Sequence, residues 1–145
     1  MIITQPKEYI ASFVQLMGGG GPFKEYTAIG LVRNNELVAG VIYTFYTGAN
    51  ICMHVGAKPG RMWLNREFLH ACFDYPFNEL KCRRVTGLVP KKNKQARRFD
   101  EHIGFTLEGM MRHALADDDI CVYGLLKENC KWSRPVSAKP LSLAA

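Results

Sequence analysis

A chain of 145 residues, 48% of them hydrophobic, can bury one sizeable core but is too short for two ordinary domains. No run approaches the roughly 18 apolar residues of a membrane span, and the first ten residues lack the basic-then-apolar order of a secretion signal, so we expect a soluble, cytoplasmic protein. The formal net charge of +6 is concentrated in Lys81–Arg98, which holds eight Lys or Arg and no acidic residue; this favours attraction to a polyanion over an ordinary solvated surface.

The N-terminal segment predicts a short strand and one amphipathic helix. Met1–Thr4 can form the strand, and Pro6 suits the start of a helix over Lys7–Met17, where apolar residues recur at three- and four-residue spacing. Gly18–Gly21 and Pro22 then end the helix in a mobile loop, which is either a lid over a ligand or a linker.

Three β-type segments follow, separated by turn residues, of which Asn34-Asn35 is the first pair. They are Tyr26–Asn34, Glu36–Gly48 and Ala49–Ala57. Their order predicts three consecutive antiparallel strands.

A second helix is predicted over Trp63–Leu80, with Pro76 kinking or ending its regular part. Cys82–Val89 then reads as a half-buried strand. The crossover from Ile51–Val55 through this helix to that strand is the part of the sheet that we expect to be parallel.

The C-terminal half predicts a further helix and a hairpin. Asn93 starts the helix, which runs to Ile103 and is closed by Gly104 in the left-handed conformation. Phe105–Leu115 and Ile120–Glu128 are predicted as the two strands of the hairpin.

The element order predicts an α/β (α+β) fold: a mixed, mostly antiparallel sheet flanked by helices in one domain, residues 1–132. Residues 133–145, rich in Pro, Ser and Ala, are expected to be disordered. Five scattered cysteines without a CxxC pair indicate free thiols. Cys52 and His54 share a strand face but have no further ligands at suitable spacing, so no metal site is expected.

One spacing carries a resemblance to a known family: an Asn, an Ala three residues later, and Gly-Phe eleven and twelve residues after the Asn. Here these are Asn93, Ala96, Gly104 and Phe105. With "EGMMR" after them, they resemble the ribosomal-protein alanine acetyltransferase-like branch of the general N-acetyltransferase (GNAT) superfamily, and the resemblance covers roughly residues 26–132. "DYPFNEL" and "YGLLKENCKW" are similar to short phage-encoded members.

The resemblance implies the acyl-CoA N-acyltransferase fold and direct transfer of an acetyl group from acetyl-CoA to an amine. The acceptor is a protein amine or a small amine, and for a phage protein it would be a host or phage component in the host cytoplasm. A homodimer through the last strands is compatible with this pattern, and no membrane partner is expected.

In the family, acetyl-CoA lies in a V-shaped opening between the fourth and fifth strands. The resemblance therefore assigns its pantetheine amides to the backbone of Met53, His54 and Val55. The pyrophosphate would lie on the loop and first helical turn that follow. The usual motif glycine of that loop is Trp63 here, and a left-handed conformation would cost this residue about 1–2 kcal/mol, so the loop must have another shape.

The remaining CoA-binding residues implied by the resemblance belong to two segments. In the loop they are Lys58, Arg61, Met62 and Trp63, with Arg66 as a further cation to offset the missing glycine. On the later helix they are Asn93, Ala96, Arg97 and Arg98, where Arg97 or Arg98 would face the 3′-phosphate. The alternative role of Asn93 is a plain helix N-cap.

Three side chains are candidates for proton transfer. His54 lies beside the expected thioester and titrates near neutrality, so it is the first candidate for the base, unless it is a core or surface histidine. Glu108 is the second, and a salt bridge is its alternative. Asp100 occupies the position where many family members carry a Tyr that protonates the leaving thiolate. It serves as an acid only if burial raises its pKa; otherwise it is an exposed helix residue or an Arg partner.

Two other functions stay open at this point. Lys81–Arg98 suits a nucleic-acid-binding module, but the segment has no interleaved aromatic residues to stack bases, so specific binding is not expected. A catalytically weak GNAT scaffold that acts by gripping another protein is the other alternative.

Overall fold

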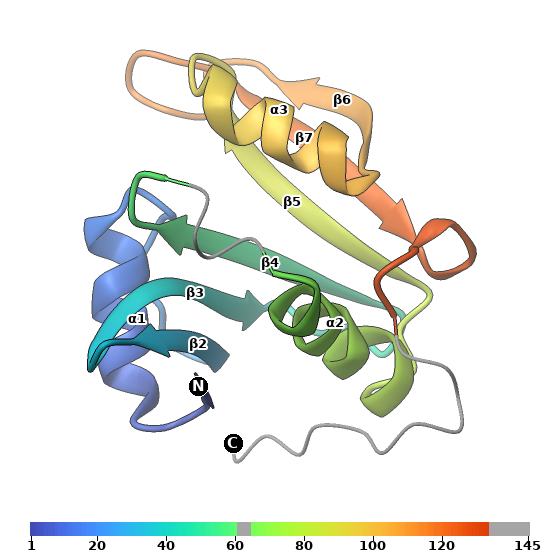
Figure 1. Cartoon of the computed structure of the whole chain (residues 1–145). Coiled ribbons are helices and arrows are strands. Elements are labelled where there is room, and N and C mark those ends of the chain that lie inside the picture. The colour runs from blue at the N-terminus through green and yellow to red at the C-terminus, as the bar shows by residue number, and fades with distance from the viewer. Residues whose placement is uncertain (61–64, 134–145) are drawn as a thin grey trace.

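The computed structural model of the chain describes residues 1–60 and 65–133. These residues form a seven-stranded sheet with helices packed on it (Figure 1). The strands are β1 (Ile2–Ile3), β2 (Thr27–Arg33), β3 (Glu36–Thr44), β4 (Asn50–Ala57), β5 (Arg84–Pro90), β6 (Thr106–Met111) and β7 (Ile120–Leu126). The helices are α1 (Lys7–Leu16), α2 (Arg66–Asp74) and α3 (Lys94–Ile103), with a π-helical turn (Tyr75–Glu79) and a 3₁₀ turn (Lys127–Asn129).

The strand order is β1-β2-β3-β4-β5-β7-β6, and all neighbouring strands are antiparallel except β4 and β5. The chain crosses from β4 to β5 through α2, as expected for a parallel pair, which needs a crossover connection. The expected mixed, mostly antiparallel α/β sheet flanked by helices is confirmed.

The predicted and observed elements agree closely in the N-terminal half, with one difference in β3. Asn34 and Asn35 adopt φ of 51° and 63°, as a tight hairpin turn requires. β3 was predicted to reach Gly48 but ends at Thr44. The next residue, Phe45, has φ 54°, a left-handed conformation that takes the chain out of the sheet.

The second helix differs more from its prediction over Trp63–Leu80. α2 starts at Arg66, and Asn65 caps it by accepting a hydrogen bond from the Phe68 amide at 2.6 Å. The regular helix ends at Asp74, and the π-helical turn follows, because Pro76 has no amide hydrogen with which to continue the α-helical ladder. Trp63, where the predicted helix began, lies outside the described residues.

Alternation along the central strands sends side chains to two separate cores. On one face, Ile10 and Val14 of α1 pack against Ala28, Leu37 and Ile42. On the other face, a larger cluster joins the sheet to α2 and α3. The two faces of the sheet are therefore occupied by different helices, α1 on one side and α2 with α3 on the other (Figure 1).

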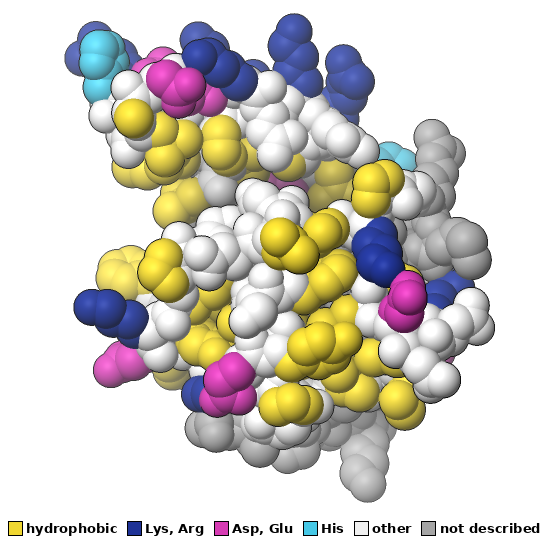
Figure 2. All heavy atoms as spheres, turned by 90° about the vertical axis from the view of Figure 1, so that its left-hand side faces the viewer, with side chains coloured by type: hydrophobic (Ala, Val, Ile, Leu, Met, Phe, Trp, Pro, Cys, Tyr) yellow, Lys and Arg dark blue, Asp and Glu magenta, His cyan; other side chains and the backbone are white. Residues whose placement is uncertain are grey.

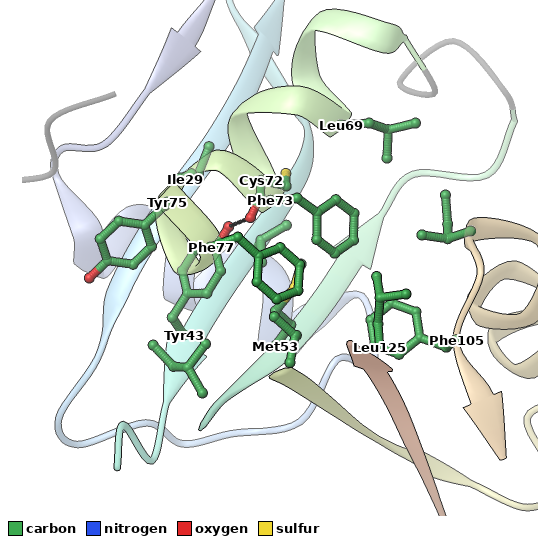
Figure 3. Close-up of a cluster of buried hydrophobic side chains, with 14 of the residues drawn as sticks. Ile29, Tyr43, Met53, Leu69, Cys72, Phe73, Tyr75, Phe77, Phe105 and Leu125 are labelled. Carbon is green, nitrogen blue, oxygen red and sulfur yellow. Dashed lines mark hydrogen bonds between the residues drawn. The ribbon is translucent and has the colours of Figure 1, made fainter. Parts of the chain in front are cut away.

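Aromatic side chains fill the larger core beneath α2 (Figure 3). The hydroxyl of the buried Tyr43 donates a hydrogen bond to the carbonyl of Cys72 at 2.6 Å, and the two rings of Tyr43 and Tyr75 meet edge to face at 4.9 Å. The ring of Phe73 lies 6.2 Å from that of Phe105, which follows α3. This last contact joins the α2 side of the core to the α3 side.

Close backbone packing of α1 on the sheet requires glycine in β4. A Cβ atom added at Gly56 would lie 2.8 Å from the Cα of Val14, too close for any real contact. We expect Gly56→Ala to lower the free energy of unfolding by about 1–3 kcal/mol, because α1 must shift as a unit. The control is Gly109→Ala, where no atom lies within 4 Å of the added methyl group. Urea unfolding measures both, and equal stabilities of the two variants would contradict the proposed packing.

None of the described helices is long and apolar enough to cross a membrane. The five cysteines are free, as expected, and four of them are buried.

Candidate active site

The strands β4 and β5 separate partway along their length. They pair in parallel from Asn50 with Arg84 to Met53 with Gly87, and the ladder stops there although β4 continues to Ala57 and β5 to Pro90. Figure 1 shows the two strands diverging from this point, and Figure 2 shows the surface hollowed between an upper and a lower part of the molecule. The backbone of β4 after Met53 therefore has no strand partner on its β5 side.

The opening persists because each strand is held on its outer side. β4 is paired with β3 from Cys52 to Ala57, and β5 is paired with β7 from Arg84 to Pro90. Beneath the opening lies a cavity of about 30 Å³ lined by apolar side chains of β4, α2 and α3, among them Met53 and Val55. Two rigid ladders thus flank a gap with an apolar floor.

Asp100 of α3 points to the place where the strands part. Its Oδ2 lies 3.0 Å from where a Cβ atom on Gly87 would be, and it is the acidic residue that lines the apolar cavity. Burial raises the pKa of its carboxyl from 3.8 to about 7, and the charge of Glu101 contributes less. The Asp100 side chain makes no hydrogen bond with any other described residue. The expectation that Asp100 is exposed or paired with an Arg is therefore wrong. The alternative expectation, a carboxyl whose pKa is raised by burial, agrees with the structure.

His54 lies at the same level on the opposite face of the sheet. It is the first residue of β4 beyond the last β4–β5 pair. Its Nε2 is 2.7 Å from the Thr44 hydroxyl, and its ring is 5.1 Å from the ring of Phe23. A Cβ atom on Gly20 would lie 3.7 Å from its Nδ1, so the glycine loop covers this ring. Burial lowers the pKa of the imidazole, which favours its neutral form at neutral pH.

Asp100 therefore lies at the gap on one face of the sheet, whereas the His54 ring lies on the opposite face, beneath the glycine loop. A reactive group placed between the parted strands could receive a nucleophile from the His54 side and release a leaving group toward Asp100. A neutral imidazole can accept a proton, and a carboxyl with a raised pKa can donate one near neutral pH.

Glu108 does not join these two residues. Its carboxylate pairs with the Arg84 guanidinium, with Nη2 2.7 Å from Oε1 and Nη1 3.3 Å from Oε2. It belongs to the edge strand β6, which β7 and β5 separate from β4, so roughly 14 Å of strand spacing lies between β6 and β4. Glu108 therefore forms the salt bridge that was given as the alternative to its role as a base.

The residues expected to hold the pyrophosphate are only partly described. Arg61, Met62 and Trp63 lie outside the described residues. Lys58 forms an exposed salt bridge with Glu36 at 2.7 Å, so its charge is already paired.

Arg66, the cation expected to offset the missing glycine of that loop, is the first residue of α2. Its guanidinium carbon is 5.9 Å from the centre of the Trp132 ring. Asn65 is a residue that the sequence analysis missed, although an Asn just before a helical pattern is an N-cap signal.

On α3, Asn93 has the N-cap role, since its Oδ1 accepts a hydrogen bond from the Ala96 amide at 3.1 Å. Arg97 is engaged within the protein: its Nε donates to the Tyr123 hydroxyl at 3.1 Å and its Nη1 to the Lys91 carbonyl at 3.3 Å. Arg98 is exposed and makes no such contact with the described residues, so it is the better placed of the two arginines to meet an external phosphate.

The basic segment Lys81–Arg98 does not form one continuous surface. The residues Lys81–Arg84 lie at the start of β5, and Lys91–Arg98 lie beyond its end. The seven residues of β5 span roughly 20 Å, which separates the two groups. The positive charge of this segment is therefore divided between the two ends of β5.

No group of three or more His, Cys, Asp or Glu side chains suited to a metal ion occurs among the residues that the structure describes.

No protein-family model and no curated protein sequence matches the chain. Solved structures do match it. Spermidine N-acetyltransferase from Vibrio cholerae, in complex with CoA and spermine, aligns with a TM-score of 0.69 at 13% identity over 89% of this chain and 96% of that chain. A point mutant of the same enzyme aligns with a TM-score of 0.70 at 14% identity over 88% and 94% of the two chains.

A protein provisionally described as an acetyltransferase aligns with a TM-score of 0.64 at 21% identity. The alignment covers 74% of this chain but 60% of that one, so the chain spans less than two thirds of that protein. These likenesses show that the chain has the fold of the N-acetyltransferases.

Proposed function

We propose that this chain, built on the fold of the N-acetyltransferases, transfers an acetyl group from acetyl-CoA to an amine. The observation that carries the proposal is the parting of β4 and β5 after Met53 and Gly87, with Asp100 at the gap on one face of the sheet and His54 on the other face. The complex of the Vibrio cholerae enzyme with CoA and spermine supports both classes of ligand.

Acetyl-CoA would lie in the opening with its pantetheine amides bonded to the backbone of β4 where that strand leaves β5, at Met53, His54 and Val55. Arg98 would meet the 3′-phosphate, and the loop before α2 would hold the pyrophosphate. The apolar floor of the gap excludes water from the thioester, which strengthens the polar contacts made there.

In the proposed reaction, the neutral amine attacks the thioester carbonyl and loses its proton to His54, and the C–S bond breaks. The CoA thiolate leaves toward Asp100, which supplies its proton. The products are an N-acetyl amine and CoA as a thiol, and the protons on the two residues exchange with solvent. Positioning the two reactants contributes most, about 7–11 kcal/mol, while each proton transfer contributes about 10²–10⁴-fold.

The acceptor that we propose is a primary amine of a protein or a small molecule. The resemblance to the ribosomal-protein branch favours a protein amine, in the host cell if the protein is phage-encoded, while the Vibrio cholerae structure contains a polyamine. A homodimer would use the free edge of β6, the last strand of the sheet.

The test is calorimetry with acetyl-CoA, followed by mass spectrometry of a panel of amines: a peptide with a free N-terminal Ala, the same peptide with a blocked N-terminus and one Lys, and spermidine. Saturable binding and a mass gain of one acetyl group on one panel member are expected. Absence of saturable binding would remove the enzymatic proposal, and binding without transfer to any member would favour the scaffold alternative.

The pH dependence of kcat tests the two proton-transfer roles. His54 must be neutral to accept a proton, so activity rises through its lowered pKa; Asp100 must be protonated to donate, so activity falls above about pH 7. We expect a bell-shaped profile whose acidic limb belongs to His54 and whose alkaline limb lies near pH 7, and His54→Gln should lose the acidic limb only. Using one acceptor for both proteins cancels the titration of the acceptor itself. An acidic limb that survives in the variant would assign the base to another group.

A further inference from the structure

A second hollow lies at the closed end of the β4–β5 pair, opposite the active-site opening. It has a volume of about 470 Å³, within the range of roughly 300–1,000 Å³ that small-molecule sites occupy. Its walls come from the start of β5, the end of β7 and the turn before β4. The lining residues are Ala49, Lys81, Cys82, Arg83, Arg84, Leu126, Lys127 and Glu128.

The lining is strongly basic, with four cationic side chains and one carboxylate, Glu128. Arg84 is already committed, because it binds Glu108. The side chains of Lys81, Arg83 and Lys127 form no hydrogen bond or ion pair with any other described residue. Three cations around one concavity repel each other, and an anion between them would relieve this repulsion.

The backbone holds the cationic walls in place. The Arg83 amide donates to the Ala49 carbonyl at 2.7 Å, and the Lys127 amide donates to the Arg83 carbonyl at 3.0 Å. These bonds tie the beginnings of β4 and β5 to the end of β7. The hollow is therefore formed before any ligand arrives, which lowers the cost of ordering on binding.

We propose that this hollow is an anion-binding site for a phosphate-bearing ligand, held by Lys81, Arg83 and Lys127. Arg83 suits the forked recognition of phosphate oxygens, and the lysines act as point charges beside it. The site is separate from the acetyl-CoA opening, since the paired segment from Asn50 to Met53 lies between them. It explains the first half of the basic segment, which the proposed transferase reaction does not use.

The test is calorimetric titration of the 145-residue chain with inorganic tripolyphosphate and with ATP. We compare the double variant Arg83→Gln/Lys127→Gln with the control Lys24→Gln/Arg112→Gln, which removes the same charge from exposed positions outside both proposed sites. Circular dichroism confirms that both are folded.

We expect saturable binding to the parent protein. The first variant should weaken it at least about tenfold, because charge-assisted hydrogen bonds are lost, and the control should weaken it less than about twofold. Equal affinity for tripolyphosphate and ATP would identify the phosphates as the recognised group, and tighter binding of ATP would identify a nucleotide. Equal losses in both variants, a larger loss in the control, or no saturable binding of either probe would overturn the site.

Discussion

Replacing Asp100 by Asn is expected to lower kcat for acetyl transfer by about 10²–10⁴-fold, the usual contribution of a positioned general acid. Asn has nearly the same size and fits beside Gly87, where the Asp100 carboxyl now lies. It cannot release a proton to the departing thiolate. The dissociation constant of acetyl-CoA should stay nearly unchanged, because Asp100 acts on the leaving group and not on the bound thioester.

The control is Asp117→Asn, which makes the same chemical change on an exposed carboxylate outside the site. Steady-state kinetics with one acceptor gives kcat for both variants, and calorimetry gives the acetyl-CoA affinity. The alkaline limb of the pH profile should also disappear in Asp100→Asn. A kcat within about threefold of the parent protein would show that the thiolate leaves without help from this residue, as its reference pKa near 8.5 allows.

The same Asp100→Asn change is expected to stabilise the fold above neutral pH. The folded protein holds a proton on Asp100 up to about pH 7, whereas the unfolded chain releases it near pH 3.8. Between these values the folded state binds more protons, so the free energy of unfolding falls as pH rises. Asn removes this loss, and because Asp100 keeps some contact with solvent the gain at pH 8 should be about 2–4 kcal/mol.

Urea unfolding followed by tryptophan fluorescence measures this effect at about pH 3.5 and pH 8, on either side of the two pKa values. The two proteins should differ by much less at the lower pH, where the carboxyl is mostly protonated in both states. A variant that gains nothing at pH 8 would mean that Asp100 is ionised in the folded protein without a penalty, and its role as an acid would lose its basis. Lower activity together with higher stability is the usual signature of a strained functional group.

The fold could be predicted because its signals are local. The helical spacing of Lys7–Met17, the Asn34-Asn35 turn and the Gly104 stop each depend on residues adjacent in sequence, and the structure has all three. The errors occur where contacts between distant segments determine where an element ends. β3 stops where Phe45 turns out of the sheet, and Pro76 produces a π-helical turn, which periodicity does not distinguish from the end of a helix.

The site was less predictable because it depends on which side chains meet across the sheet. The pKa of Asp100 follows from burial between α2 and α3, and sequence spacing does not reveal that environment. Gly87 was a missed signal, since a glycine inside a strand pattern can mark close approach of another group. Thr44 and Phe23, which contact His54, come from segments far from it in the chain and had no signal of their own.

The four residue pairs from Asn50–Arg84 to Met53–Gly87 are a short hinge between two plates, one built on β1–β4 and the other on β5–β7. Backbone bonding fixes the plates at one end only, and beyond it the angle between them depends on side-chain packing in the core. A ligand that lies in the opening touches both plates and acts as a clamp on this angle. A bound ligand would thus make the whole molecule more rigid and more stable, without any movement of a separate lid.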